Sequence, residues 1–131
     1  VDKFEDVTML YSDIKGFTEF SNNKDPSAVV DALATLYTRF DQLVYDINKS
    51  CGPDEPKLYK LYTIGDAYIV LSFLDKDKRD KLKEAKNVMK MAEGMRVAIE
   101  EVKQAINYNG LQMRLGLHTV RNILLFFKIL G

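Results

Sequence analysis

The sequence has little of several features that mark special classes of protein. Its 131 residues include one cysteine, three prolines and no tryptophan. The single cysteine, Cys51, excludes an internal disulfide framework and is typical of a reducing compartment. No apolar run is long enough to span a bilayer, so we expect no membrane helix in this chain. We therefore expect a cytosolic domain, and any membrane anchor would belong to a larger parent protein.

An excess of charge of one sign is also missing. Nineteen basic and nineteen acidic residues cancel, so the chain has no general attraction for nucleic acid or for an anionic membrane. An anion site would have to be local. The composition that remains, 47% hydrophobic and 29% charged, is typical of a folded domain, and the length suffices for one core.

Hydrophobic patterning predicts six elements. A two-residue gap between the second and third strands, Gly65 and Asp66, indicates a tight hairpin. Apolar residues at three- and four-residue spacing predict both helices, and proline after Asp25 suits a helix start. The expected elements are a strand at 7–11, a helix that starts at 25–26 and ends within 50–56, strands at 58–64 and 67–74, a helix that stops at 109–110, and a strand at 111–118.

This order of elements predicts an α+β fold, a ferredoxin-like antiparallel sheet with the helices packed on one face. The first and third strands are central neighbours in such a sheet. The end of the first strand then lies beside the start of the third. We therefore expect Asp13 and Asp66 to be adjacent.

Two adjacent carboxylates repel each other unless a cation lies between them, and hard oxygen ligands favour Mg²⁺ or Mn²⁺. Directly after Asp13, the segment 14–18 predicts a turn into a short helix, whose free backbone amides could hold phosphate oxygens. A metal site beside a phosphate site is typical of phosphoryl and nucleotidyl transfer.

Taken singly, each of these residues also has a structural explanation. Asp13 alone is an ordinary carboxylate at a strand end, and Asp66 alone is an ordinary hairpin residue. Gly16 and Gly65 could simply serve turns. His118, the sole histidine, has no visible cysteine or serine partner, so we expect it to pack or cap rather than to catalyse.

Three segments taken together indicate a function more specifically than any of these single residues. They are FEDVTMLYSDIKGFTEF at 4–20, KLYTIGDAYIV at 60–70 and MRLGLHT at 113–119. In this order they resemble three successive signatures of class III adenylyl and guanylyl cyclase catalytic domains, including guanylyl cyclases of protists. The resemblance covers residues 4–119, and a joint match is far more specific than any single motif.

This resemblance implies a two-metal site at a dimer interface. Asp13 and Asp66 would bind two Mg²⁺ or Mn²⁺ ions, the Ile14 carbonyl would add a ligand, and Arg114 would contact phosphate. The backbone of three residues would hold the triphosphate: Gly16, Phe17 and Thr18. Such a site converts a nucleoside triphosphate to the 3′,5′-cyclic nucleotide and pyrophosphate by in-line attack of the ribose 3′-hydroxyl.

The position that reads the base departs from the pattern. In the family it is typically glutamate for guanine and lysine for adenine, but here it is Tyr62. The chain therefore resembles the metal-bearing half of a two-domain enzyme, whose complementary domain reads the base. The TIGDAY turn is more similar to guanylyl members, so GTP is favoured over ATP.

The last segment departs further. Residues 1–119 resemble part of the catalytic domain, but residues 120–131, VRNILLFFKILG, lack the glycine-rich turn of the family. They could be a divergent strand. Their possible codons instead suggest a short retained intron translated as protein. On this hypothesis the domain is C-terminally truncated, lacks its last strands and helices, and does not turn over alone.

Two other functions stay open. One is a catalytically silent regulatory or dimerisation half of a cyclase, although a silent half has no need for the full set of Asp13, Asp66 and Arg114. The other is a ferredoxin-like nucleic-acid-binding module. That module would need exposed aromatic and basic residues on the sheet, and a strand that ends in an aspartate does not fit it.

Overall fold

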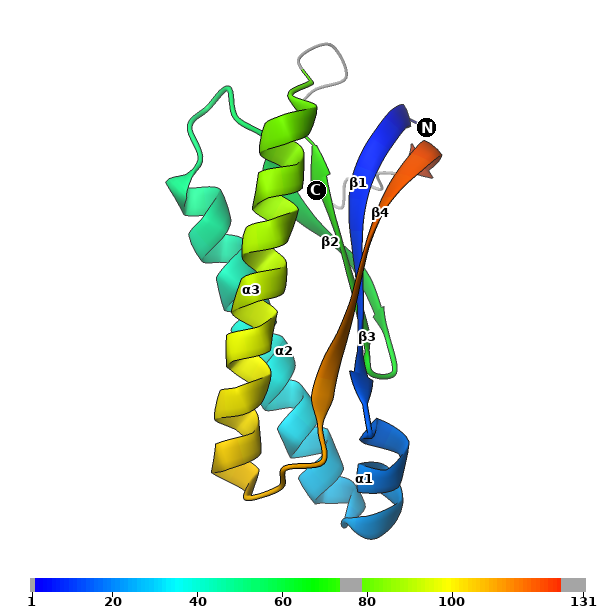
Figure 1. Cartoon of the computed structure of the whole chain (residues 1–131), viewed down its shortest axis with the longest axis vertical. Helices are drawn as coiled ribbons and strands as arrows, with labels where there is room; N and C mark the ends of the chain where they lie inside the picture. The colour runs from blue at the N-terminus through cyan, green and yellow to red at the C-terminus, as the bar shows by residue number, and fades with distance from the viewer. Residues whose placement is uncertain (1, 74–78, 126–131) are drawn as a thin grey trace, which may run out of the picture.

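A computed structural model describes residues 2–73 and 79–125. These residues form one antiparallel sheet, with two long helices against one face and a short helix at one end (Figure 1). The elements are β1 (Asp2–Lys15), α1 (Phe17–Asn23), α2 (Pro26–Ser50), β2 (Lys57–Ile64), β3 (Ala67–Phe73), α3 (Lys81–Ile106) and β4 (Gln112–Leu125). The strand order β2-β3-β1-β4 confirms the predicted ferredoxin-like α+β fold.

Strands β1 and β4 are longer than predicted. β1 continues past residue 11 because the polar Ser12 is accommodated in the sheet, where its hydroxyl donates to the Tyr68 carbonyl at 2.8 Å. β4 continues past residue 119, with Val120 opposite Val7 on β1. The intron hypothesis for residues 120–131 stays a prediction, and its last six residues, like position 74 of the third predicted strand, lie outside the described part.

The core lies between the sheet and the two long helices. Alternate residues of β1 and β3 face it, and the apolar stripes of α2 and α3 close it, as the helical spacing predicts. Full burial of such a side chain contributes about 1.5–3 kcal/mol relative to exposure. Its fully buried members include Leu10, Tyr68, Val70, Leu36, Phe40, Val88, Met91 and Met95.

The hairpin between β2 and β3 has the predicted two-residue turn, since Ile64 pairs with Ala67. Gly65 has a φ of 56°, and a Cβ added there would meet no atom within 4 Å. The glycine is therefore required by the backbone and not by crowding. A positive φ at the first central residue is the pattern of a type II′ turn, whose twist matches that of paired strands.

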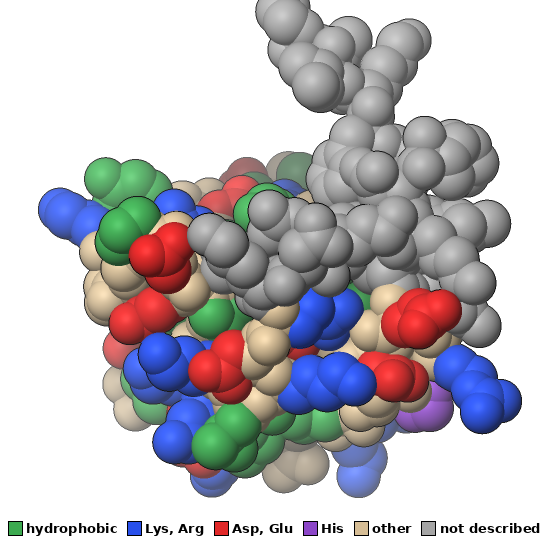
Figure 2. Space-filling model, turned by 90° about the horizontal axis from the view of Figure 1, so that it is seen from above, with side chains coloured by type: hydrophobic (Ala, Val, Ile, Leu, Met, Phe, Trp, Pro, Cys, Tyr) green, Lys and Arg blue, Asp and Glu red, His purple; other side chains and the backbone are tan. Residues whose placement is uncertain are grey.

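Charged side chains of both signs share the surface. In the view from above (Figure 2), basic and acidic groups are interspersed, in keeping with the zero net charge of the sequence. Among residues 2–73 and 79–125, no helix combines the length and the apolar character that crossing a membrane requires.

Candidate metal and nucleotide site

Asp13 and Arg114 lie directly opposite each other on β1 and β4. The guanidinium donates from Nε to one carboxylate oxygen at 2.6 Å and from a terminal nitrogen to the other at 2.9 Å. The hydrogen bond to Asp13, and then the charge of Asp13, raise the pKa of Arg114. The Arg114 side chain is 63% exposed and that of Asp13 only 19%, so the arginine covers the carboxylate from the solvent side.

Asp66 joins the same site from the hairpin. Its carboxylate accepts a hydrogen bond from the Ile14 amide at 3.0 Å, and Ile14 directly follows Asp13. The predicted adjacency of the two strand ends is therefore present in the structure. In an antiparallel strand the amide and the carbonyl of one residue point toward the same neighbour, so the Ile14 carbonyl lies on the Asp66 side of β1.

Tyr37 on α2 also reaches this site, which the sequence did not predict. Its hydroxyl donates to the Gly65 carbonyl at 2.6 Å and lies 3.3 Å from the Ala67 carbonyl. Burial, and then the negative charge of Asp66, raise the pKa of Tyr37 to about 12. In the sequence, Tyr37 is only one member of an apolar stripe, and nothing in that pattern separates a ring that packs from a hydroxyl that holds a turn.

Gly16 forms the N-cap of α1 with a φ of 86°. A Cβ at this position would lie 2.2 Å from the Gly110 carbonyl oxygen, so the close approach of two backbone segments requires glycine. Phe17 and Thr18 follow as the first helical residues. The first amides of a helix have no acceptor within the helix, so they are available for a polar ligand.

Tyr62 lies apart from Asp13. It is 46% exposed and pairs with Ile69, which in turn pairs with Tyr11 on β1. Opposite residues share a sheet face, so Tyr62 is on the face of Asp13 but two strands away. His118 is exposed on β4, so it does not pack into the core, and the expectation that it does not catalyse stays a prediction.

The donor set consists of oxygen atoms: two carboxylates and one backbone carbonyl. No group of three or more His, Cys, Asp or Glu side chains suited to a metal occurs in the described ranges. Mg²⁺ is typically held by one or two carboxylates, with substrate phosphates and water completing the shell. Asp13, Asp66 and the Ile14 carbonyl therefore fit a metal that binds together with a nucleotide.

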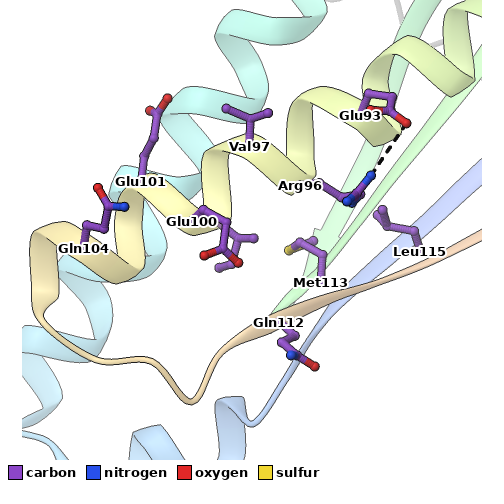
Figure 3. A pocket seen from close by; sticks show the side chains of 10 residues that line it. Glu93, Arg96, Val97, Glu100, Glu101, Gln104, Gln112, Met113 and Leu115 are labelled. Atoms are coloured by element: carbon purple, nitrogen blue, oxygen red, sulfur yellow. Dashed lines mark ion pairs between the residues drawn. The ribbon is translucent and has the colours of Figure 1, made fainter.

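A pocket of about 570 Å³ lies elsewhere, between α3 and β4 (Figure 3). Its lining includes Met113 and the ion pair of Arg96 with Glu93, whose charged atoms are 3.7 Å apart. Met113 packs against the core beneath the helices, and neighbours along a strand alternate between faces. The pocket is therefore on the opposite side of β4 from Arg114, and neither Asp13 nor Asp66 lines it.

Comparison with known proteins identifies the family. A profile of the family described as "Adenylate and Guanylate cyclase catalytic domain" matches residues 1–123. The chain belongs to this family.

The chain is 43% identical over 117 residues to the guanylate cyclase soluble subunit alpha-2 of Rattus norvegicus, a match that covers 89% of this chain and 14% of the relative. It therefore spans only a small part of that protein. The guanylate cyclase domain of RhGC from Catenaria anguillulae, solved with GTP, superposes with a TM-score of 0.68 at 22% identity, covering 93% and 59% of the two chains. A dimeric guanylyl cyclase domain of the RhoGC fusion protein from Blastocladiella emersonii superposes with a TM-score of 0.67 at 22% identity, and the match covers 92% of this chain and 59% of that one. Both likenesses confirm the fold.

Proposed function

We propose that this chain supplies the metal-bearing half of a nucleotidyl cyclase site, which converts a nucleoside triphosphate to the 3′,5′-cyclic nucleotide and pyrophosphate. The observation that carries the proposal is the meeting of two strand ends, where Asp66 accepts from the Ile14 amide and Asp13 pairs with Arg114. Family membership over residues 1–123 supports the same chemistry.

The roles of the residues follow from their chemistry. Asp13, Asp66 and the Ile14 carbonyl would hold two divalent cations, Mg²⁺ or Mn²⁺. When bound, these ions would lower the pKa of the ribose 3′-hydroxyl and neutralise charge on the phosphates. Arg114 is an exposed cation beside the carboxylates, and it could exchange Asp13 for a phosphate oxygen, since its planar fork suits both anions.

The phosphate chain would extend toward α1. The backbone at Gly16, Phe17 and Thr18 follows Asp13 and Ile14 without interruption, and its free amides favour anions. Gly16 permits the close approach of this segment to the loop that contains Gly110. Asp13 is therefore joined to this segment by continuous backbone, and Asp66 is linked to it by the hydrogen bond from the Ile14 amide.

A complementary domain would complete the site. Tyr11, Tyr62 and Ile64 are 44%, 46% and 65% exposed on the face that also presents Asp13, and exposed apolar side chains gathered on one face are typical of an interface. Because Tyr62 specifies neither guanine nor adenine, the complementary domain would recognise the base. GTP is favoured over ATP, and the similarity to a guanylate cyclase subunit supports this preference.

The alternative is a catalytically silent half that only supports a partner. The ion pair of Arg114 with Asp13 favours it, because the guanidinium already satisfies both oxygens of that carboxylate. The two functions differ in their dependence on divalent cations and in whether the carboxylates matter for turnover.

The test is to combine the chain with a candidate complementary domain, add Mn²⁺ and either GTP or ATP, and measure the cyclic product. Asp13→Asn and Asp66→Asn should each reduce turnover by about 100-fold or more, and chelation of the metal should abolish it. Asp31→Asn, at an exposed position on α2, is the matched control. Product formation indifferent to both site substitutions would refute the catalytic assignment and favour the silent half.

A further inference from the structure

The contact of α2 with the β2–β3 turn is set by aromatic packing. The Tyr37 ring lies 6.1 Å from the Phe40 ring and 5.4 Å from the Tyr68 ring, between centroids. Phe40 and Tyr68 are both fully buried. Packing against two buried rings fixes the direction of the Tyr37 ring, so its hydroxyl is aimed at the turn and is not free to sweep through solvent.

The hydroxyl meets the backbone on both sides of Asp66. It donates to the Gly65 carbonyl at 2.6 Å, and the Ala67 carbonyl lies 3.3 Å away. A hydroxyl has one proton to donate, so the shorter contact is the main hydrogen bond. The carbonyl groups of the two residues next to Asp66, Gly65 and Ala67, thus lie against one fixed group from the helix layer.

The turn has little packing of its own. Ile64 is 65% exposed, and the space around Gly65 is open. At the same time the Asp66 carboxylate must be directed at β1, where it accepts from the Ile14 amide at 3.0 Å. Ala67 on the other side of Asp66 is buried, but the two residues before Asp66 offer no packing that could fix its direction, and Tyr37 restrains the turn there.

We propose that Tyr37 is a positioning residue that holds the Asp66 turn in the geometry needed for metal binding. This inference rests on the proposed role of Asp66 as a metal ligand. Tyr37 acts through the Gly65 carbonyl and does not touch the metal or the nucleotide. The ordinary pKa of a tyrosine, about 10, keeps this hydroxyl protonated and a donor over the physiological range of pH.

The first test uses Tyr37→Phe, which removes the hydroxyl and keeps the ring. Amide hydrogen exchange of the whole chain, followed by NMR, should show the Ile14 amide exchanging about three- to tenfold faster relative to the Leu10 amide on the same strand, as expected for loss of one hydrogen bond. Tyr45→Phe is the matched control, since Tyr45 is on the same helix and 60% exposed. An unchanged ratio in Tyr37→Phe would overturn the proposal.

A second comparison separates positioning from general loosening. Tyr68→Phe removes the hydrogen bond of Tyr68 to Asp41, 2.5 Å long, without touching the turn, so the ratio of Ile14 to Leu10 exchange should stay constant. Asp66→Asn alters the acceptor of the Ile14 amide itself. In that variant the further substitution Tyr37→Phe should therefore increase Ile14 exchange by less than Tyr37→Phe does in the parent chain. Two outcomes would contradict a specific role of Tyr37. One is a rise of the Ile14 to Leu10 exchange ratio in Tyr68→Phe equal to that in Tyr37→Phe. The other is a double variant in which the effects of Tyr37→Phe and Asp66→Asn on Ile14 exchange simply add.

Mn²⁺ titration followed by electron paramagnetic resonance links the restraint to the metal. Tyr37→Phe should weaken Mn²⁺ binding by about three- to tenfold, and Tyr45→Phe should leave it unchanged. Equal Mn²⁺ affinity of Tyr37→Phe and the parent chain would overturn the positioning role. If the parent chain binds no Mn²⁺ even with GTP or ATP and a candidate complementary domain present, while Ile14 exchange still rises in Tyr37→Phe, the proposed function fails, and Tyr37 only holds the turn in place.

Discussion

The two faces of the sheet are built by different forces. On the helix-covered face, Leu10 and Val70 are 0% exposed within one continuous apolar cluster. On the open face, the same strands and their neighbours present Asp13 and Arg114 together with the exposed ring of Tyr62. Burial of apolar area stabilises the fold mainly on the covered side. The open side has a smaller buried cluster of Val7, Leu71 and Phe73, and it also carries the charged groups.

Polar groups on the two sides differ in the same way. Beneath the helices, Tyr68 donates to Asp41 at 2.5 Å, and burial followed by this hydrogen bond raises the pKa of Tyr68. On the open face, Asp13 pairs with Arg114, which is largely in solvent. The pair has two hydrogen bonds, and the Asp13 side chain is only 19% exposed, which strengthens an ion pair, so any other ligand of Asp13 would have to displace the arginine.

The largest expected effect is on the covered face. Phe40→Ala should lower the free energy of unfolding by about 3–5 kcal/mol, because Phe40 is 0% exposed and contacts the rings of Tyr37 and Tyr68. Val30→Ala, at a position of α2 that is 64% exposed, should change it by less than about 0.5 kcal/mol. Chemical denaturation of both variants measures the difference, and a loss below about 1 kcal/mol in Phe40→Ala would contradict the contrast between the faces.

The covered face was largely predictable from sequence. Apolar spacing fixed both long helices, and the pair Gly65 and Asp66 fixed the hairpin, because these signals are local in the chain. Strand ends were less predictable. β1 runs through Ser12 to Lys15, since a polar residue is stable in a central strand when another strand supplies its partner, and that partner, the Tyr68 carbonyl, is 56 residues away.

The open face was predictable only in part. The adjacency of Asp13 and Asp66 followed from strand order, but the two-point hydrogen bond of Arg114 to Asp13 joins residues 101 positions apart. Tyr37 was missed because a tyrosine in an apolar stripe can direct its hydroxyl to solvent or to a backbone carbonyl. That choice depends on three-dimensional packing, which residue spacing does not encode.

A smaller effect is expected on the open face. Ile64→Lys should weaken assembly with a complementary cyclase domain by about tenfold, which is about 1.4 kcal/mol, because Ile64 is 65% exposed beside the proposed interface. The free energy of unfolding should change by less than about 0.5 kcal/mol. Leu82→Lys, at an α3 position that is 66% exposed, is the control and should assemble normally. Sedimentation measures assembly, and equal losses in both variants would show that charge alone, and not this face, governs association.

The smallest effect concerns two serines that occupy the same covered face and are both 0% exposed. Ser12 donates to the Tyr68 carbonyl at 2.8 Å, whereas the Ser72 hydroxyl has no hydrogen-bond partner among the residues that the structure describes. Ser12→Ala should therefore cost about 1 kcal/mol, and Ser72→Ala should be neutral or should stabilise by up to about 1 kcal/mol, because it removes a polar group that is buried without compensation. Thermal unfolding of the two variants decides the matter. If Ser72→Ala is as costly as Ser12→Ala, the contribution of a buried serine on this face does not depend on a hydrogen-bond partner, and this account of how the covered face accommodates polar groups is wrong.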